Sequence, residues 1–430
     1  MTSYAVTPLD QPVSARISVP GSKSITNRAM ILAALAHGSS TITGALASED
    51  TQVMTEALQS LGYSIQVDND GSVISVRGQS GQIPVHSAAL NLANSGTSIR
   101  FLAALCSLGH GTFRLDGTDR MRERPQGPLL NGLRQLGVNA SSASGNGCPP
   151  LIIETTGWTN GDCQLDASAS SQFISALLMA APCSGRNVHI ATNEAFRPLY
   201  VTITTQMMHQ WGVMVDNPQN NIWHIQSGQR YKAMPVYPVE PDASSASYFF
   251  AAAALTGGSV VINQLHDNAL QGDIRFATEI LPRMGCTTVE TAEGLKVTGP
   301  ALTELQGIDV DMSLISDTSL TLAALALFAN GPTRVRGIAH SRLQECDRIN
   351  AVVTEARKLG AAVEEYEDGW QIWPSRSLHG ATIETYNDHR VAMSFALAGL
   401  RIPGVKIVNP ACTGKTFPGY WQTLETLYSP

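Results

Sequence analysis

One pattern of residues recurs at a nearly constant interval along this chain of 430 residues. In each copy, a short polar segment opens a helix rich in Ala and Leu, and a Gly, a β-branched strand and a second helix follow. The copies begin 71 to 75 residues apart, at Ser22, Ser95, Ser170, Ser244, Asp317 and Asp388. A period this regular predicts six copies of one α/β unit.

The two helices of each copy carry different end signals. The first helix opens with Ser or Asp, which are typical N-cap residues, and for Asp317 an N-cap is the default interpretation. Its Ala/Leu run is apolar on all sides, so the first helices should be buried inside a domain. The second helix of the first five copies ends before a Gly, as helix C-terminal caps do. These glycines recur 73 to 75 residues apart, at Gly62, Gly137, Gly212, Gly285 and Gly360.

Chain length and the repeat together predict two domains. A chain of 430 residues is too long for one ordinary core, and six copies divide evenly into three per domain. A break is expected near residue 235, where the segment AMPVYPVEPD carries Pro235, Pro238 and Pro241.

Charge and composition exclude several classes of protein. The net charge of -7 argues against a general binder of nucleic acids or membrane surfaces, because no excess of positive charge is available. The N-terminus lacks a signal-peptide pattern, and no apolar run is long enough to span a bilayer. The seven cysteines are scattered without a CxxC pair, which favours reduced thiols in the cytoplasm. No HExxH pair occurs, so no metal site is expected.

An anionic ligand would therefore need a local cluster of basic groups. Lys23 lies in PGSKSITNR and Lys415 in CTGKTFP, and neither segment has the glycine spacing of a P-loop. Arginines gather in RMRERP, SRLQECDRI and YNDHR. Since Arg binds carboxylates and phosphates bidentately, a substrate carrying both groups would suit these clusters. Internal salt bridges are the alternative, also for Glu345, which stands between basic neighbours.

Segments in a fixed order carry a resemblance to a known family. They are VPGSKSITNRA, NSGTSIRFLAA, RMRERP, DASASSQFISALLM, DASSASYF, QGDIRFA, ECDRI, TYNDHRVAMSFA and CTGKTFP. Together they resemble the signature segments of the 5-enolpyruvylshikimate-3-phosphate (EPSP) synthases. The resemblance implies a two-domain inside-out α/β barrel, with three βαβαββ units per domain around buried parallel helices. It also implies domains of residues 21–239 and of 1–20 with 240–430, and an active site in the cleft between them.

The same resemblance implies an activity and a set of residues. EPSP synthases move the enolpyruvyl group of phosphoenolpyruvate to the 5-hydroxyl of shikimate 3-phosphate, on the route to chorismate and the aromatic amino acids. The implied phosphoenolpyruvate contacts are Lys23, Gly96, Arg124, Gln172, Arg348, Arg390 and Lys415. The implied shikimate 3-phosphate contacts are Ser24, Arg28, Ser170, Ser171, Gln172, Arg197, Tyr200, Asp317, His340 and Gln344. Asp317 would be the base, Glu345 the acid and Lys23 a proton shuttle, in a monomer that needs no metal or organic cofactor.

Some positions depart from the commonest family pattern. Gln344 stands where many members have Lys, and His340 stands where many have Asn. Arg197 stands near the position where a phosphate-contacting Ser is usual in the family. Phe101 replaces a common Pro near the loop that sets tolerance to the inhibitor glyphosate. These departures keep open an enolpyruvyl transferase for another phosphorylated acceptor, or a ligand-binding paralogue without catalysis. The enzyme that modifies UDP-N-acetylglucosamine is disfavoured, because the segment HGTFRLDGTDRMRERP lacks the loop Cys on which that enzyme relies.

Overall fold

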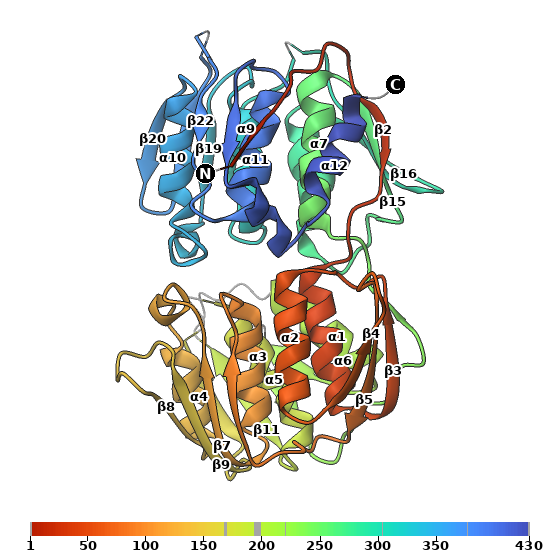
Figure 1. Cartoon of the computed structure of the whole chain (residues 1–430), viewed down its shortest axis with the longest axis vertical. Helices are drawn as coiled ribbons and strands as arrows, with labels where there is room; N and C mark the ends of the chain where they lie inside the picture. The colour runs from red at the N-terminus through yellow and green to blue at the C-terminus, as the bar shows by residue number, and fades with distance from the viewer. Residues whose placement is uncertain are drawn as a thin grey trace. The chain divides into compact units, whose positions relative to one another are not determined.

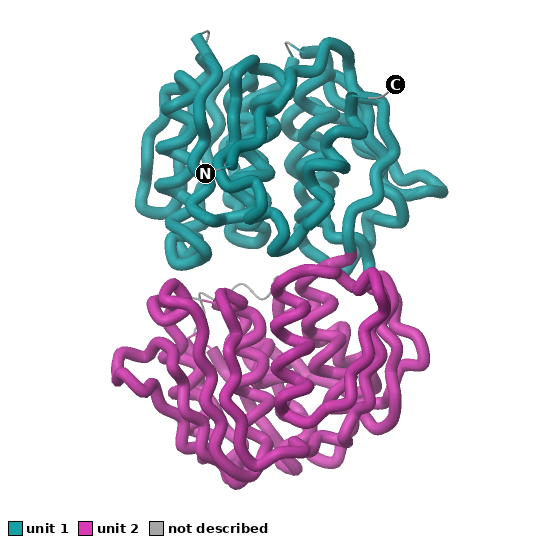
Figure 2. Tube along the Cα trace, in the orientation of Figure 1, with its two compact units in different colours: residues 1–20, 240–430 teal, residues 21–239 magenta. Residues whose placement is uncertain are grey.

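The computed structural model describes residues 2–166, 170–192, 199–219, 221–302, 304–375 and 377–428. The chain forms two compact units (Figure 2). We call Gly21–Val239 the N-terminal unit, and Met1–Pro20 together with Glu240–Pro430 the C-terminal unit. Within the described residues, no helix is long and apolar enough to cross a membrane.

The N-terminal unit is built around three inner helices that pack against one another (Figure 1). They are α1 (Lys23–Leu35), α3 (Gly96–Cys106) and α5 (Gln172–Ala180). A second helix follows each of them, namely α2 (Glu49–Ser60), α4 (Gly127–Gln135) and α6 (Leu199–Gln210). Polar contacts join the first turns of α3 and α5, so these two helices begin at the same end of the unit.

Three four-stranded sheets complete this unit. The first contains β14 (Tyr237–Pro238), β3 (His37–Thr43), β5 (Val73–Gln79) and β4 (Ser64–Val67). The second contains β6 (Ser87–Asn91), β7 (His110–Asp116), β9 (Leu151–Thr156) and β8 (Asn139–Ser142). The third contains β10 (Asp162–Leu165), β11 (Val188–Thr192), β13 (Ile222–Ile225) and β12 (Asp216–Gln219). In each sheet the first pair is parallel and the other pairs are antiparallel.

The C-terminal unit repeats this plan around a second set of inner helices. They are α7 (Ala243–Thr256), α9 (Ser319–Ala326) and α11 (His389–Gly399). The second helices are α8 (Leu281–Arg283), which continues a π-helix over Phe276–Ile280, then α10 (Arg348–Lys358) and the short α12 (Tyr420–Glu425).

The first residues of the chain supply strands to two sheets of the C-terminal unit. The four-stranded sheets are β16 (Thr287–Thr291), β17 (Gly294–Thr298), β15 (Ser259–Asn263) and β2 (Ser14–Ile17), and β18 (Asp309–Asp311), β19 (Thr333–Arg336), β21 (Gly369–Trp373) and β20 (Ala362–Tyr366). The three-stranded sheet holds β1 (Ser3–Ala5), β23 (Lys406–Val408) and β22 (Thr382–Ile383). The parallel pairing of β2 with β15 and the antiparallel pairing of β1 with β23 anchor the N-terminal segment in this unit.

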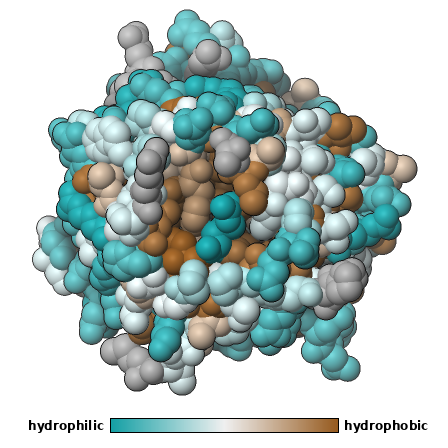
Figure 3. All heavy atoms as spheres, turned by 90° about the horizontal axis from the view of Figure 1, so that it is seen from above, coloured by the Kyte–Doolittle hydropathy of each residue, from teal (hydrophilic) through white to brown (hydrophobic). Residues whose placement is uncertain are grey.

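Each unit is thus an α/β barrel turned inside out, with apolar helices inside and sheets outside. Every residue of α3, α7, α9 and α11 is buried, which confirms that the Ala/Leu runs are internal. The face of the molecule seen in Figure 3 has apolar side chains at its centre and hydrophilic ones around them, in keeping with this arrangement.

The predicted helix starts are correct for some copies and wrong for others. Ser22 caps α1 by accepting from the backbone N–H of Ile25 at 3.3 Å, and Asp388 likewise caps α11. In the fourth copy the cap is Asp242, and Ser244 lies inside α7. The N-cap interpretation of Asp317 is wrong: Thr318 precedes α9, and the Asp317 carboxylate is bound by arginine side chains instead.

The predicted helix-ending glycines have the conformation that such caps require. All five have φ between +87° and +98°, in the left-handed region where a Cβ is unfavourable. At Gly137 a Cβ would also overlap Thr159 Oγ1.

Gly137→Ala should therefore lower the free energy of unfolding by about 2 kcal/mol or more, because backbone strain and a steric overlap add. Urea denaturation measures the change. The matched control is Gly185→Ala, where φ is +75° but nothing lies within 4 Å of the new Cβ. The control should cost only the strain, about 1 kcal/mol. Equal effects at the two sites would contradict the role given to Thr159.

Candidate active site

In the C-terminal unit, carboxylates and cations converge near the start of α9, α10 and α11. Arg348, whose side chain is 2% exposed, donates from Nη1 to Asp317 Oδ1 at 2.9 Å and from Nη2 to Glu345 Oε2 at 3.0 Å. Its Nε donates to Asp388 Oδ2 at 2.8 Å, and Gln344 Oε1 accepts a further bond. One guanidinium therefore links the segments that precede α9, α10 and α11.

Two further cations complete this group. Arg390 Nη2 donates to Asp317 Oδ2 at 2.8 Å, so the Asp317 carboxylate lies between two guanidinium groups. Lys415 Nζ donates to Glu345 Oε1 at 2.9 Å. We call Asp317, Glu345, Asp388, Arg348, Arg390 and Lys415 the C-terminal cluster.

The charges of the C-terminal cluster stabilise one another in a buried setting. Burial alone would lower the pKa of Arg348, but the carboxylates of Asp388, Glu345 and Asp317 raise it well above its usual range. The pKa of Arg390 is raised in the same way, mainly by Asp317. Both arginines therefore stay charged, and an anionic ligand would have to replace carboxylates as their partner.

His340 lies beside this cluster, with Nε2 2.9 Å from Ser316 Oγ. Burial lowers the pKa of His340 below its usual 6.5, the Asp317 carboxylate raises it in part, and Arg348 lowers it further. The net effect keeps the ring neutral at pH 7, so it can share a hydrogen bond with a hydroxyl group.

This pKa shift predicts a pH dependence of stability. The unfolded chain takes up the proton of His340 as the pH falls below about 6.5, before the folded chain does, so folding loses free energy there. The stability contribution is complete above pH 6.5 and is lost as the pH falls through the lowered pKa of the folded state. Urea midpoints of the wild type should drop between about pH 7.5 and 5.5 by more than those of His340→Asn. An identical drop in both proteins would contradict this contribution.

A second group of cations lies in the N-terminal unit, in or beside its inner helices. Arg28 on α1 is 1% exposed; it donates from Nε to Thr204 Oγ1 at 2.8 Å and from Nη1 to the Ser24 carbonyl at 2.9 Å. Its Nη2 reaches the carbonyl of Tyr200 at 3.3 Å. Lys23, five residues earlier, pairs with Asp50 at 3.1 Å.

Arg124 and Gln172 hold fixed positions near the start of α3. Arg124 Nη1 donates to the carbonyl of Asn94 at 3.2 Å. A Cβ at Gly96 would overlap the Arg124 guanidinium, so only glycine leaves this side chain its place. Gln172 Oε1 accepts from Arg100 Nη1 at 2.7 Å, and Gln172 Nε2 donates to Thr97 Oγ1 at 3.2 Å.

The remaining sequence candidates of this unit lie at the start of α5 and α6. Ser170 Oγ accepts from the backbone N–H of Gln172 at 3.3 Å, and Ser171 is the N-cap residue of α5 without a side-chain cap bond. Tyr200 is the second residue of α6. Arg197 lies outside the described residues. We call Lys23, Ser24, Arg28, Gly96, Arg124, Ser170, Ser171, Gln172 and Tyr200 the N-terminal cluster.

The two clusters differ in how their charges are balanced. In the C-terminal cluster, Arg348, Arg390 and Lys415 all bind carboxylates. In the N-terminal cluster, neither Arg28 nor Arg124 has a carboxylate partner among the described residues. The Nε of Arg124 has no hydrogen-bond partner at all in that part of the chain. A buried cation without an acid is costly, so this arrangement favours an anionic ligand.

Sequence reasoning assigned no role in these clusters to several residues that hold them together. Asp388 is fully buried under Arg348, Asp50 binds Lys23, and Arg100 orients Gln172. Asp388 was predicted only as a helix start, and Arg100, which lies within a motif segment, could have been singled out there. Asp50 follows the N-cap residue of the second helix in its repeat, and none of the motif segments includes it.

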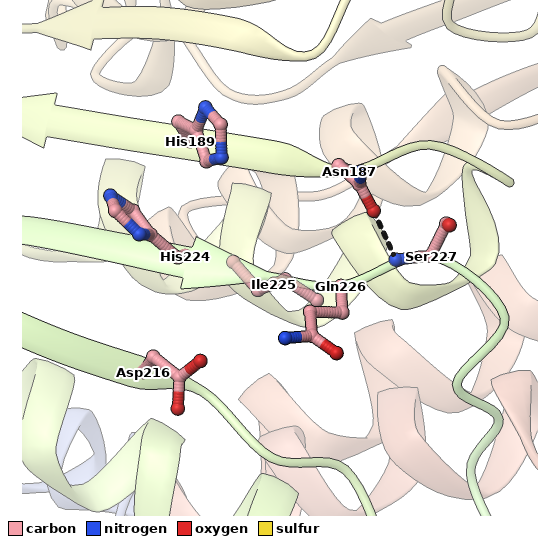
Figure 4. A pocket seen from close by; sticks show the side chains of 7 residues that line it. All are labelled: Asn187, His189, Asp216, His224, Ile225, Gln226 and Ser227. Atoms are coloured by element: carbon pink, nitrogen blue, oxygen red, sulfur yellow. Dashed lines mark hydrogen bonds between the residues drawn. The ribbon is translucent and has the colours of Figure 1, made fainter.

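A separate hollow of about 400 Å³ lies on the outer face of the third sheet (Figure 4). Its lining residues are Asn187, His189, Asp216, His224, Ile225, Gln226 and Ser227. None of them is Lys or Arg, and none was a candidate from the sequence, so the hollow does not suit a phosphorylated ligand. Among the described residues, no group of three or more His, Cys, Asp or Glu is placed to hold a metal ion.

Comparisons with known proteins agree with this chemistry. A family model described as EPSP synthase (3-phosphoshikimate 1-carboxyvinyltransferase) matches residues 9–424. The 3-phosphoshikimate 1-carboxyvinyltransferase of Trichormus variabilis is 45% identical over 422 residues, which cover 98% of each chain. The chloroplastic enzyme of Solanum lycopersicum is 41% identical over 428 residues, covering 96% of this chain and 82% of that protein.

Solved structures give the same result. An EPSP synthase from Acinetobacter baumannii superposes with a TM-score of 0.83 at 26% identity, covering 99% of this chain and 98% of that one. The enolpyruvyl transferase NikO from Streptomyces tendae shares the fold, with a TM-score of 0.78 at 18% identity over 99% and 97% of the two chains. On this evidence, the chain belongs to the EPSP synthase (3-phosphoshikimate 1-carboxyvinyltransferase) family.

Proposed function

We propose that this enzyme transfers the enolpyruvyl group of phosphoenolpyruvate to the 5-hydroxyl of shikimate 3-phosphate and releases inorganic phosphate. The observation that carries the proposal is the Asp317 carboxylate held between Arg348 and Arg390. A base flanked by two anion-binding cations suits a reaction that removes a proton beside a donor bearing a carboxylate and a phosphate.

The donor site draws on both clusters. Lys23, Gly96, Arg124 and Gln172 would come from the N-terminal cluster, and Arg348, Arg390 and Lys415 from the C-terminal cluster. Phosphoenolpyruvate carries a carboxylate and a phosphate, and the lysines and arginines of this set, five cations in all, would bind these two anionic groups. Because the residues belong to different units, each unit by itself should be inactive.

The acceptor site would likewise use residues of both units. Ser24, Arg28, Ser170, Ser171, Gln172, Arg197 and Tyr200 would bind shikimate 3-phosphate from the N-terminal unit. Asp317, His340 and Gln344 would do so from the C-terminal unit. Arg28 and the hydroxyl groups of Ser170 and Ser171 are the natural partners of the phosphate, because none of the described carboxylates competes for Arg28.

The chemistry then follows from the two acids of the C-terminal cluster. Asp317 takes the proton of the 5-hydroxyl group while the hydroxyl oxygen of the acceptor bonds to C2 of phosphoenolpyruvate. Glu345 gives a proton to the methylene carbon of phosphoenolpyruvate. The product is a tetrahedral ketal phosphate. The Glu345 carboxylate formed in this way then takes a proton back from the methyl group as phosphate, stabilised by Lys23, departs and the enol ether forms.

The bound donor would also release the catalytic carboxylates. In the structure, Asp317 and Glu345 are held by Arg348, Arg390 and Lys415 at 2.8 to 3.0 Å. When the donor's carboxylate and phosphate take over these cations, the two carboxyl groups become available for proton transfer.

The test is phosphate release from phosphoenolpyruvate, measured with and without shikimate 3-phosphate. The proposal expects release that depends on the acceptor. If the protein binds phosphoenolpyruvate but releases no phosphate with this acceptor, the assignment of shikimate 3-phosphate is wrong. Another phosphorylated acceptor then becomes the candidate, which Gln344 favours because it brings no cation where many family members have Lys. We further propose that the protein lies in the cytoplasm and is a monomer. Light scattering at the elution peak would check the oligomeric state.

A further inference from the structure

Arg28 is the most deeply buried cation of the N-terminal cluster, and its neighbours are neutral. Besides Thr204 and the two carbonyls, Nη2 donates to Ser175 Oγ at 3.5 Å. Thr204 Oγ1 donates in turn to Ser175 Oγ at 2.9 Å, so both hydroxyls are fixed. Within the described residues, no carboxylate pairs with this guanidinium, although burying a charge without an acid is costly.

An aromatic ring takes the place that an acid would occupy. The guanidinium carbon of Arg28 lies 5.2 Å from the centre of the Phe101 ring, within cation–π range. Phe101 is 1% exposed and belongs to α3, whereas Arg28 belongs to α1. Because water is excluded, the attraction between the cation and the ring face is stronger than at a surface.

A ring and a carboxylate have different consequences for a ligand. A carboxylate neutralises the cation, and an incoming anion must displace it, as at Arg348 and Arg390. A ring stabilises the cation without bringing negative charge. Burial lowers the pKa of Arg28 to about 10, so the group still carries its full charge at neutral pH.

We infer that Phe101 is a positioning residue of the acceptor site, which holds the Arg28 guanidinium ready for the anionic group of the acceptor. The inference rests on the proposed function and adds a residue to it. Arg28 Nη1 also binds the Ser24 carbonyl in the first turn of α1, and Ser24 is another residue of the proposed acceptor site.

The experiment compares Phe101→Leu with the wild type. Leucine keeps an apolar side chain but removes the ring face. The dissociation constant of shikimate 3-phosphate, measured by calorimetry without phosphoenolpyruvate, should rise about tenfold, which corresponds to a buried cation–π contact. In the steady state, KM for shikimate 3-phosphate should rise while KM for phosphoenolpyruvate stays unchanged.

Two further variants separate positioning from packing. Phe101→Tyr keeps the ring and should bind shikimate 3-phosphate like the wild type. Phe113→Leu removes an equally buried ring from β7 of the same unit and should leave the dissociation constant unchanged. If Phe101→Leu does not fold, Phe101→Met serves in its place.

The inference is wrong if Phe101→Leu binds the acceptor as tightly as Phe113→Leu, or if Phe101→Tyr binds as weakly as Phe101→Leu. If the wild type neither binds shikimate 3-phosphate nor releases phosphate, the proposed function fails instead. The affinities of the same variants for inorganic phosphate are then compared. Phe101→Leu is expected to bind phosphate more weakly than the wild type, Phe101→Tyr and Phe113→Leu. Equal affinities of Phe101→Leu and either of the other two variants would overturn the inference.

Discussion

Asp317→Asn is expected to lower the rate of acceptor-dependent phosphate release by about a thousandfold, the middle of the range for a general base. Asparagine has nearly the same shape but cannot take the proton of the acceptor hydroxyl. It also leaves the guanidinium groups of Arg348 and Arg390 without the carboxylate that they share. The measurement is kcat for phosphate release with both substrates saturating.

A matched control distinguishes lost chemistry from a general effect of removing a charge. Asp309 also pairs with an arginine, Arg336, at 2.8 Å, but both side chains are largely exposed. Asp309→Asn should therefore leave kcat unchanged. If Asp317→Asn still binds both substrates and loses less than about tenfold in kcat, Asp317 is not the base, because that loss lies below the general-base range.

Arg348→Met is expected to lower the free energy of unfolding of the C-terminal unit by about 3 to 5 kcal/mol. The reason is that the substitution leaves buried carboxylates without their cation. Asp388 is fully buried and accepts a charged hydrogen bond from Arg348 Nε at 2.8 Å, and Glu345 and Asp317 lose a partner as well. Uncompensated buried carboxylates are far more costly than the loss of an apolar contact.

Urea denaturation measures this effect, and the transition of the C-terminal unit is the relevant one if the two units unfold separately. Arg336→Met, which breaks the exposed pair with Asp309, should cost only about 0 to 1 kcal/mol. Arg348→Lys, which keeps the charge but loses the fork of donors, should lie between the two. Equal midpoints for Arg348→Met and Arg336→Met would contradict the structural role of the cluster.

The repeat was visible in the sequence because its causes are local. An Ala/Leu run that is apolar on all sides must be buried wherever it occurs, and the structure buries α7, α9 and α11 completely. A glycine after the second helix marks a left-handed turn that other residues avoid, and Gly137 and its four counterparts adopt it. These local signals predicted α/β units with buried helices, whereas the inside-out barrel was implied by the resemblance to the family.

Helix caps were less predictable, because several polar residues often stand near one helix start. In DASSASYF, Asp242 and Ser244 are both suitable caps, and the structure uses Asp242. At Asp317 the local preference for an N-cap competes with two guanidinium groups. The ion pairs prevail there, since charged hydrogen bonds are about twice as strong as neutral ones.

The sequence by itself determined the repeats, the burial of the inner helices and, through its motifs, the family. Only the tertiary structure decided which charges meet. Asp317 is bound by Arg348 and Arg390, which lie 31 and 73 residues away along the chain, and Asp50 binds Lys23 from another helix. Helix and strand patterns arise from neighbours in the sequence, whereas these ion pairs depend on how packed helices bring distant side chains within a few ångströms.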